Sequence, residues 1–343
     1  MLGHQRPFFA AVSLPVGSMQ PLSSSLDFFL QHLDRHGLSY DFNTAMVLGG
    51  AAFRHYFFTP DDNHAWLVEY PGEHWREDSL DMDNYGLFEA VQGHTGWSAR
   101  RWSVLRGPEL VTLLRHESNE ARLVAIEGTA VSKAGLIERF DASREGLTLH
   151  VSNGEASWEL RHSDLTTLDD FVAQLVPLRT LRKEPSEIPA SRRHALTSDV
   201  LRWAVRHWTS RREIRYDVEA YYATGTRAWT LLEDFARSLE THDAFADADP
   251  EVAETYVRTH LQELSVARRS AAEFFGDPAA VMEHTGLETL AAQPLDALSL
   301  AWKKSADAAQ LASQAATKEL PTAIANAHQL DADAFEQLAR FLF

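Results

Sequence analysis

Cysteine is absent from this chain of 343 residues. Without it the protein forms no disulfide, holds no thiolate-bound metal and has no cysteine nucleophile for covalent catalysis. Any acyl transfer or hydrolysis through an enzyme nucleophile would therefore have to use a weaker group, such as a serine hydroxyl. This absence limits the chemistry of the chain more than any motif that the sequence contains.

Long apolar runs and an excess of positive charge are missing as well. No segment reaches the roughly 20 apolar residues that a membrane-spanning helix needs. Residues 8–16 are apolar, but Pro15 interrupts them and no cleavage site of small residues follows, so we interpret them as a first strand or buried arm and expect a cytoplasmic protein. A net charge of −17 argues against nucleic acid and anionic membranes as partners, because both attract clustered Lys and Arg.

The chain is long enough for two domains, and its 45% hydrophobic and 24% charged residues are typical of a globular protein. The first half has a helix-rich start followed by a run of short strands that looks like an antiparallel sheet. The expected helices are 24–36, a second one leading from Tyr40 into a turn, 86–92, one opening at Pro108 and one after Asp164; the expected strands are 52–58, 101–105, 123–127, 135–141, 147–151 and 157–160. This order predicts an α+β domain over residues 1–180.

The second half has almost no strand pattern. Residues 177–189 are rich in Arg, Lys, Glu and Pro without periodicity, which indicates a linker. Helical spacing of apolar residues follows in five segments: around Val200–His207, then 218–239, 250–276, 289–317 and 331–342. We therefore predict an all-helical domain over residues 190–343.

One stretch is unusual in its small residues: Tyr40–Arg54 reads YDFNTAMVLGGAAFR, which suits close backbone packing or a turn. It is similar to the Y-D-x-x-L-M-x-x-S-G-x-A-F-R signature of the butirosin-biosynthesis H protein N-terminal family. Four further segments resemble family patterns in the same order: Arg122–Ile126, Ala134–Asp141, Gly225–Trp229 and Arg268–Phe275.

This resemblance implies a papain-like first domain, and relatives that act as acyl or aminoacyl transferases in biosynthesis or as peptidases. Such chemistry uses a thiolate at the start of the first helix, a His that takes the proton, and an Asn or Asp that orients the His. At the matching positions, residues 18–25 contain no Cys, so Ser24 would have to replace it. Lys133 stands near the position of the base, and the orienting position falls at His150 or Asn153.

Each of these candidates has a structural alternative. Ser24 can cap the helix that begins there, with Asp27 as the second member of a capping box. His150, as base or orienting group, lies in an alternating strand where a polar-face His is common. Lys133 would act as a base only if burial lowered its pKa, whereas a strand-end lysine is ordinarily solvated.

Ligand contacts are predicted at Gly50, Phe53, Arg54, Tyr222 and Trp229. The planar guanidinium of Arg54 suits a carboxylate, although a structural ion pair is the alternative. Tyr222 and Trp229 either belong to the core or line the mouth of a pocket between the domains.

No metal and no cofactor are expected. His32 and His36 share a helix face but lack the glutamate and third ligand of a zinc site. Asp78, Asp81 and Asp83 fit no calcium-loop spacing, so an acidic solvated loop is the simpler interpretation.

Three hypotheses follow. In the first, the chain is a relative of papain-fold enzymes that has lost its nucleophile and binds a small molecule, a peptide or a carrier-bound acyl group. In the second, it is an active hydrolase or acyltransferase that uses serine. In the third, it is a scaffold whose helical half forms a homodimer or docks a partner.

Overall fold

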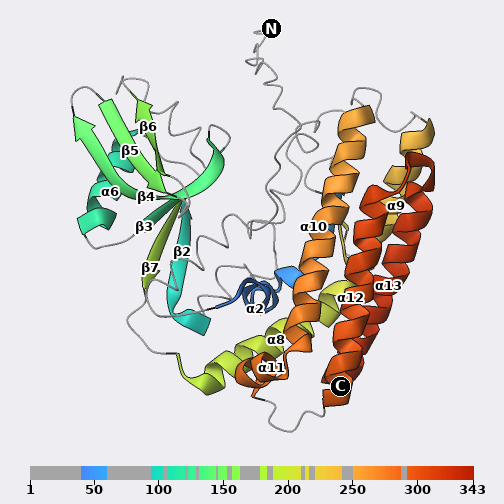
Figure 1. Cartoon of the computed structure of the whole chain (residues 1–343). Coiled ribbons are helices and arrows are strands. Elements are labelled where there is room, and N and C mark those ends of the chain that lie inside the picture. The colour runs from blue at the N-terminus through green and yellow to red at the C-terminus, as the bar shows by residue number, and fades with distance from the viewer. Residues whose placement is uncertain are drawn as a thin grey trace.

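The computed structural model describes residues 40–59, 94–102, 107–119, 123–128, 131–143, 146–152, 157–162, 178–183, 188–209, 213–215, 221–241, 250–286 and 292–343. These residues form an α+β protein with one six-stranded antiparallel sheet, one three-stranded antiparallel sheet and a set of long helices (Figure 1). The α+β class predicted from the sequence is confirmed. The helices predicted at 24–36, at 86–92 and after Asp164 lie outside the described residues.

The larger sheet has the strand order β2-β7-β3-β4-β5-β6. Strands β3 to β6 follow one another as a meander, and β7 returns to pair between β2 and β3. The strands are β2 (Trp97–Trp102), β3 (Leu123–Gly128), β4 (Val131–Ser143), β5 (Gly146–Ser152), β6 (Ser157–His162) and β7 (Leu178–Lys183). The four predicted strands between residues 123 and 160 are confirmed.

One helix, α6 (Gly107–Asn119), packs on this sheet. Its Leu110 and Leu114 are buried against Leu147, Leu149 and Val151 of β5. Those three alternate with less buried residues because successive side chains of a strand point to opposite faces. The helix predicted to open at Pro108 is therefore confirmed, with its leucines inward.

The predicted linker at 177–189 is partly wrong, because Leu178–Lys183 forms β7. Leu181 stands opposite Ala99 on one side and Leu123 on the other. The segment reads Leu-Arg-Thr-Leu-Arg-Lys, which lacks the alternation of apolar and polar residues that predicts a strand. Hydrogen bonding to strands on both sides stabilises it as a central strand.

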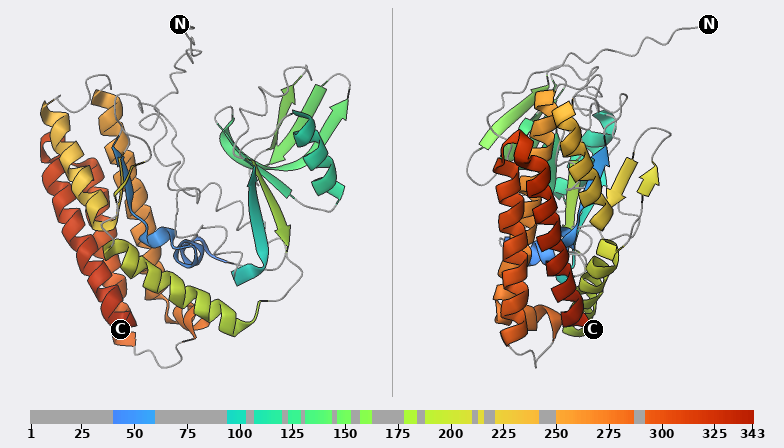
Figure 2. Two further views of the ribbon diagram at one scale, coloured as in Figure 1. Left: turned by 180° about the vertical axis from the view of Figure 1, so that it is seen from behind. Right: turned by 90° about the vertical axis from the view of Figure 1, so that its right-hand side faces the viewer.

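The long helices are α8 (Ala190–Thr209), α9 (Gly225–Thr241), α10 (Pro250–Gly276), α12 (Ala292–Gln314) and α13 (Leu320–Leu342), and the short helix α11 (Pro278–Thr285) follows α10. Helices α9, α10, α12 and α13 run side by side, and α8 crosses them near one end (Figure 2). The predicted start of α10 at Pro250 and its end at Gly276 are confirmed. Asp277 then caps α11 by accepting from the backbone N–H of Ala279 at 2.9 Å.

The smaller sheet joins the two halves of the sequence. Its order is β1-β9-β8, with β1 at Tyr56–Thr59, β9 at Tyr221–Thr224 and β8 at Glu213–Arg215. Just before β1, helix α2 (Phe42–Leu48) and the single-turn helix η1 (Ala51–Phe53) contribute to the same hydrophobic core as the long helices. These contacts cross the predicted division between residues 180 and 190.

The predicted helix over 218–239 is wrong in its first part. Tyr221 and Tyr222 lie in β9, so the second half is not all-helical, and α9 begins only at Gly225. Likewise the strand predicted from residue 52 begins at Tyr56, after η1. In both places the spacing of the apolar and aromatic residues fits a helix as well as a strand. The pairing of β1 with β9 determines which residues form strands.

Gly225 is required where β9 turns into α9, and we expect Gly225→Ala to lower the free energy of unfolding by at least about 2 kcal/mol. Its φ is +56°, and an added Cβ would lie 2.5 Å from the carbonyl oxygen of Trp208. Gly276→Ala is the matched control, because the nearest atom to its Cβ would be the Ser299 hydroxyl at 3.1 Å. Urea unfolding of both variants tests this; equal midpoints would contradict it.

Candidate functional site

The turn between α2 and β1 carries three of the predicted ligand residues. Asp41 caps α2 by accepting from the Thr44 backbone N–H at 3.0 Å. After the helix, Gly50 has a φ of +72° and opens η1. A Cβ at Gly50 would lie 3.1 Å from the Trp203 ring, so the small residue allows close contact with α8.

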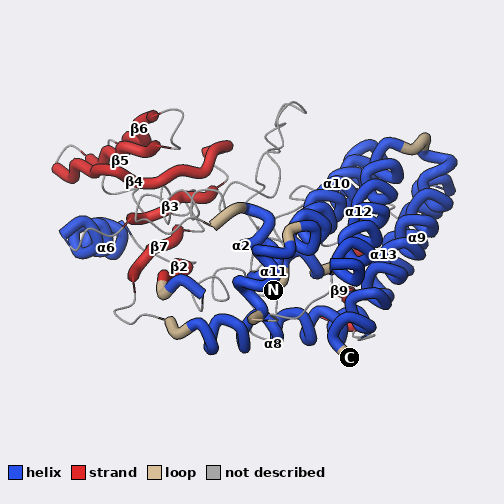
Figure 3. The backbone as a smooth tube through the Cα atoms, turned by 60° about the horizontal axis from the view of Figure 1, so that its bottom comes forward, coloured by secondary structure: helices blue, strands red, loops and turns tan. Residues whose placement is uncertain are grey.

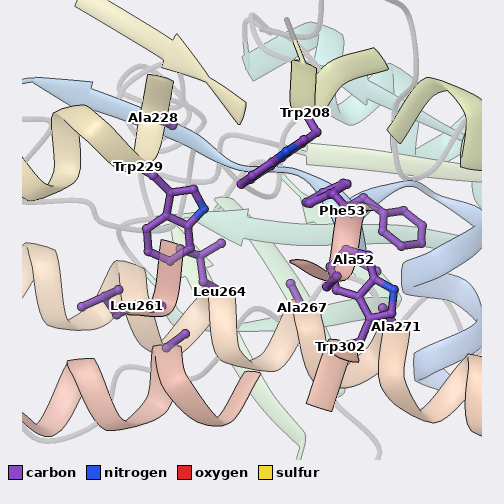
Figure 4. Packing of buried hydrophobic residues seen from close by; sticks show 14 of the residues in the cluster. Ala52, Phe53, Trp208, Ala228, Trp229, Leu261, Leu264, Ala267, Ala271 and Trp302 are labelled. Atoms are coloured by element: carbon purple, nitrogen blue, oxygen red, sulfur yellow. The ribbon is translucent and has the colours of Figure 1, made fainter. Parts of the chain in front are cut away.

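Phe53 and Arg54 point into the core beside this turn. Phe53 is fully buried beside Trp302 (Figure 4), with the two ring centroids 5.4 Å apart. The ring centroid of Phe275 lies 6.4 Å from that of Phe53. Arg54 is 2% exposed and holds its guanidinium 5.6 Å from the Trp203 ring centroid. Both residues therefore contribute to packing among the helices.

The two aromatic candidates come from the other half of the chain. Trp229 on α9 is 1% exposed, and its indole N–H donates to Asp331 Oδ2 at 2.9 Å. Tyr222 lies on β9 opposite Phe58 and Ile214. The structure thus brings Gly50, Phe53, Arg54 and Trp229 to one core, while their role as ligand contacts stays a prediction.

At the centre of this core lies a buried ion pair between α10 and α13. Arg268 donates to Asp331 from Nε at 2.7 Å and from Nη2 at 2.9 Å. Ser305 of α12 adds a third donor to the same carboxylate at 2.7 Å. The side chains of Arg268 and Asp331 are 1% and 0% exposed, so protein groups replace water around both charges.

The same arginine ties the early turn to the helices. Arg268 Nη1 donates to the carbonyl oxygens of Ala52 at 2.7 Å and Arg54 at 3.1 Å. Its guanidinium also lies over the rings of Trp302 and Phe335. One side chain therefore fixes η1, α12 and α13 relative to one another.

A pair of buried histidines lies next to this network. The Nε2 atoms of His55 and His260 are 3.1 Å apart, so one ring donates and the other accepts. Burial and then Arg268 lower the pKa of His260 to about 3. Burial, followed by His260 and Arg268, holds the pKa of His55 well below its usual value. Both rings are neutral at pH 7.

His150 lies in a different environment, on β5 between two carboxylates. Its Nε2 is 3.0 Å from Asp141 Oδ2, and its Nδ1 is 3.2 Å from Glu159 Oε1. The hydrogen bond from Arg161 lowers the pKa of the Glu159 carboxyl, which keeps that group ionised. Each ring nitrogen therefore faces a carboxylate rather than a nucleophile.

The structure does not bring the described catalytic candidates together. Arg139 of β4 stands opposite His150, and Lys133 lies six residues before Arg139 on the same strand. At the rise of an extended strand this separation is about 20 Å. Ser24 and Asn153 lie outside the described residues.

Comparison with known proteins gives no identification. The chain matches no protein-family model, and it matches no curated protein significantly. The geometry of its own residues therefore has to support any proposal about function.

Two features of the described residues bear on metals and membranes as partners. These residues contain no group of three His, Asp or Glu side chains that could hold a metal ion. Among the described helices, none combines the length and the apolar character needed to cross a membrane. The two sets considered earlier, His32 with His36 and Asp78 with Asp81 and Asp83, lie outside these residues.

Sequence reasoning missed His260, Arg268 and Asp331 as members of one network. The signal was a polar residue within an apolar stripe at helical spacing. Asp331 falls on the stripe of Ile324, Ala327, Ala334, Phe335 and Leu338, and Arg268 falls on that of Leu261, Leu264, Ala271, Ala272 and Phe275. Two opposite charges on two apolar stripes predict a buried pair, because either charge alone would be costly there.

Proposed function

We propose that this chain is a non-catalytic relative of papain-fold acyl transferases or peptidases, which binds a small molecule, a peptide or a carrier-bound acyl group. The observation that supports this most strongly is the absence of cysteine from the whole sequence. Thiolate chemistry of the papain type has no attacking atom in such a chain.

The positions of His150 and Lys133 support this proposal over a serine-dependent enzyme. A serine nucleophile needs a base within about 3 Å. His150 already faces Asp141 and Glu159 with its two nitrogens. Lys133 lies about 20 Å along β4 from it, so the two residues would not serve one nucleophile.

A scaffold function is the second candidate, and the burial of the predicted ligand residues favours it. Phe53, Arg54 and Trp229 are 0%, 2% and 1% exposed, respectively. Side chains this deep hold helices together, and a ligand would reach them only by displacing core contacts. In this alternative the helical half presents its outer surface to a partner or to a second copy.

Intact mass spectrometry after incubation with simple thioester acyl donors tests the first proposal. We expect no covalent acyl adduct, because no thiol is present and a serine hydroxyl without a base beside it is a weak nucleophile. An adduct that disappears in Ser24→Ala would contradict the proposal and support a serine acyltransferase.

The variant Ser24→Cys tests the implied papain-like scaffold separately. If residue 24 begins a helix beside a papain-like cleft, the introduced thiol should react with iodoacetamide faster than that of the matched variant Ser18→Cys, since a helix N-terminus lowers a thiol pKa. Equal reaction rates of the two thiols would argue against the papain-like scaffold. They would leave the absence of an acyl adduct, which the previous experiment tests, unaffected.

A further inference from the structure

A second group of polar side chains gathers where α2, α8 and α11 meet, a region visible in Figure 3. Tyr40 precedes α2, Arg193 lies on α8, and His284 lies on α11. His94 joins them from the segment just before β2. The Tyr40 and His284 ring centroids are 5.8 Å apart, and those of His94 and His284 are 6.3 Å apart.

His94 is the unusual member of this group. His94 is only 2% exposed, yet neither Nδ1 nor Nε2 of its ring has a hydrogen-bond partner among the described residues. Buried polar atoms in proteins are nearly always paired, with protein, water or a bound ion. The imidazole therefore offers a donor and an acceptor that the described protein groups leave unused.

Arg193 is the permanent cation among the described groups that act on His94. Burial, and then His284, Arg193 and His194, lower the pKa of His94 to about 3. The two nearby carboxylates are otherwise placed: Asp41 accepts from Thr44 at the start of α2, and Glu283 is exposed. Arg193 thus favours a negative partner over a cation at this cluster.

His194 acts as a support for this arrangement. Its Nε2 donates to the carbonyl oxygen of Glu283 at 3.0 Å, which holds α8 to the end of α11. Gly286 leaves room for the ring, because a Cβ there would lie 2.4 Å from His194 Nδ1. Arg193 immediately precedes His194 on α8, and its charge acts on Tyr40, His94 and His284.

We propose that Tyr40, His94, Arg193 and His284 bind an anionic oxygen group of a ligand, a carboxylate or a phosphate. Arg193 supplies a planar fork of N–H donors, and His94 supplies a neutral imidazole N–H. The site is separate from Gly50, Phe53, Arg54 and Trp229. It does not depend on whether the chain is catalytic, so it extends the proposed function rather than restating it.

Isothermal titration of the full chain with inorganic phosphate, and separately with acetate at the same ionic strength, tests this proposal. We expect saturable binding of at least one of the two, which also shows whether the site prefers phosphate or carboxylate. Arg193→Ala should weaken that binding about tenfold or more, as loss of a hydrogen bond to a charged group does.

Arg202→Ala is the matched control, because Arg202 lies on α8 with an exposed side chain 3.9 Å from Asp199. It should leave the affinity within about twofold, as expected for a screened surface charge. A second variant, His94→Gln, replaces the imidazole with an amide that still offers a donor and an acceptor, and it should change the preference between the two anions. No saturable binding of either anion, or equal weakening by Arg193→Ala and Arg202→Ala, would overturn the proposal.

Discussion

Asp331→Ala should lower the free energy of unfolding by about 3 to 5 kcal/mol, the largest effect expected of any single change in this chain. Its carboxylate accepts four hydrogen bonds, two from Arg268 and one each from Ser305 and Trp229. Removing it leaves the guanidinium of Arg268 charged and without its carboxylate in a dry core. Urea unfolding followed by tryptophan fluorescence measures the change.

The neighbouring pair of Arg269 and Asp307 provides a matched control. Like Arg268 and Asp331, these residues join an arginine of α10 to an aspartate of another helix, here α12, at 3.1 Å. Their side chains, however, are 55% and 51% exposed. Water and salt screen this pair, so Asp307→Ala should cost less than about 1 kcal/mol. Similar losses for Asp331→Ala and Asp307→Ala would show that the buried network does not organise the core.

Lowering the pH should destabilise the helical core at pH values well above those at which carboxyl groups ordinarily take up protons. The folded pKa of His260 is about 3, whereas an unfolded histidine titrates near 6.5. Between those two values the unfolded chain binds a proton that the folded chain does not, so stability falls as pH falls. At pH 5 the loss from His260 alone is about 2 kcal/mol.

Other histidines act in the same direction. Burial lowers the pKa of His55, His94, His284 and His328 as well. The pH dependence of the wild-type protein should therefore be steeper than one proton per molecule between about pH 6.5 and 5.

His260→Gln isolates the contribution of this one residue. The variant has no titrating imidazole at position 260, so its stability should fall less steeply between pH 6.5 and 5, while both proteins should show a flat dependence from pH 7 to 8. Urea unfolding at a series of pH values provides the comparison. Parallel curves for wild type and variant across the acid range would contradict a neutral His260 in the folded state.

Local patterns in the sequence predicted many elements and few of their partners. Pro250 and Gly276 mark the ends of α10 because a proline suits a first helical turn and a glycine suits a helix end. The alternation from Leu147 to Val151 identified β5 for a similar local reason. Tyr221 and Tyr222 were assigned to a helix wrongly, because their strand depends on β1, more than 160 residues earlier.

The polar core was harder to predict for the same reason. Arg268 contacts Ala52, Arg54 and Asp331, which lie 216, 214 and 63 residues away in sequence. A local sequence pattern does not predict which helix packs against which turn. Polar residues on apolar stripes indicated that partners must exist, but only the packed structure shows where they are.

We infer that Tyr40–Thr59 is an integral part of the helical core rather than of a separate first domain. Native-state hydrogen exchange tests it by comparing the amides of residues 51–57 with those of α10 around Arg268. We expect both sets to exchange only through the same global opening, and Asp331→Ala to lower their protection by equal amounts. Independent, faster exchange of residues 51–57, with α10 still protected, would contradict the claim.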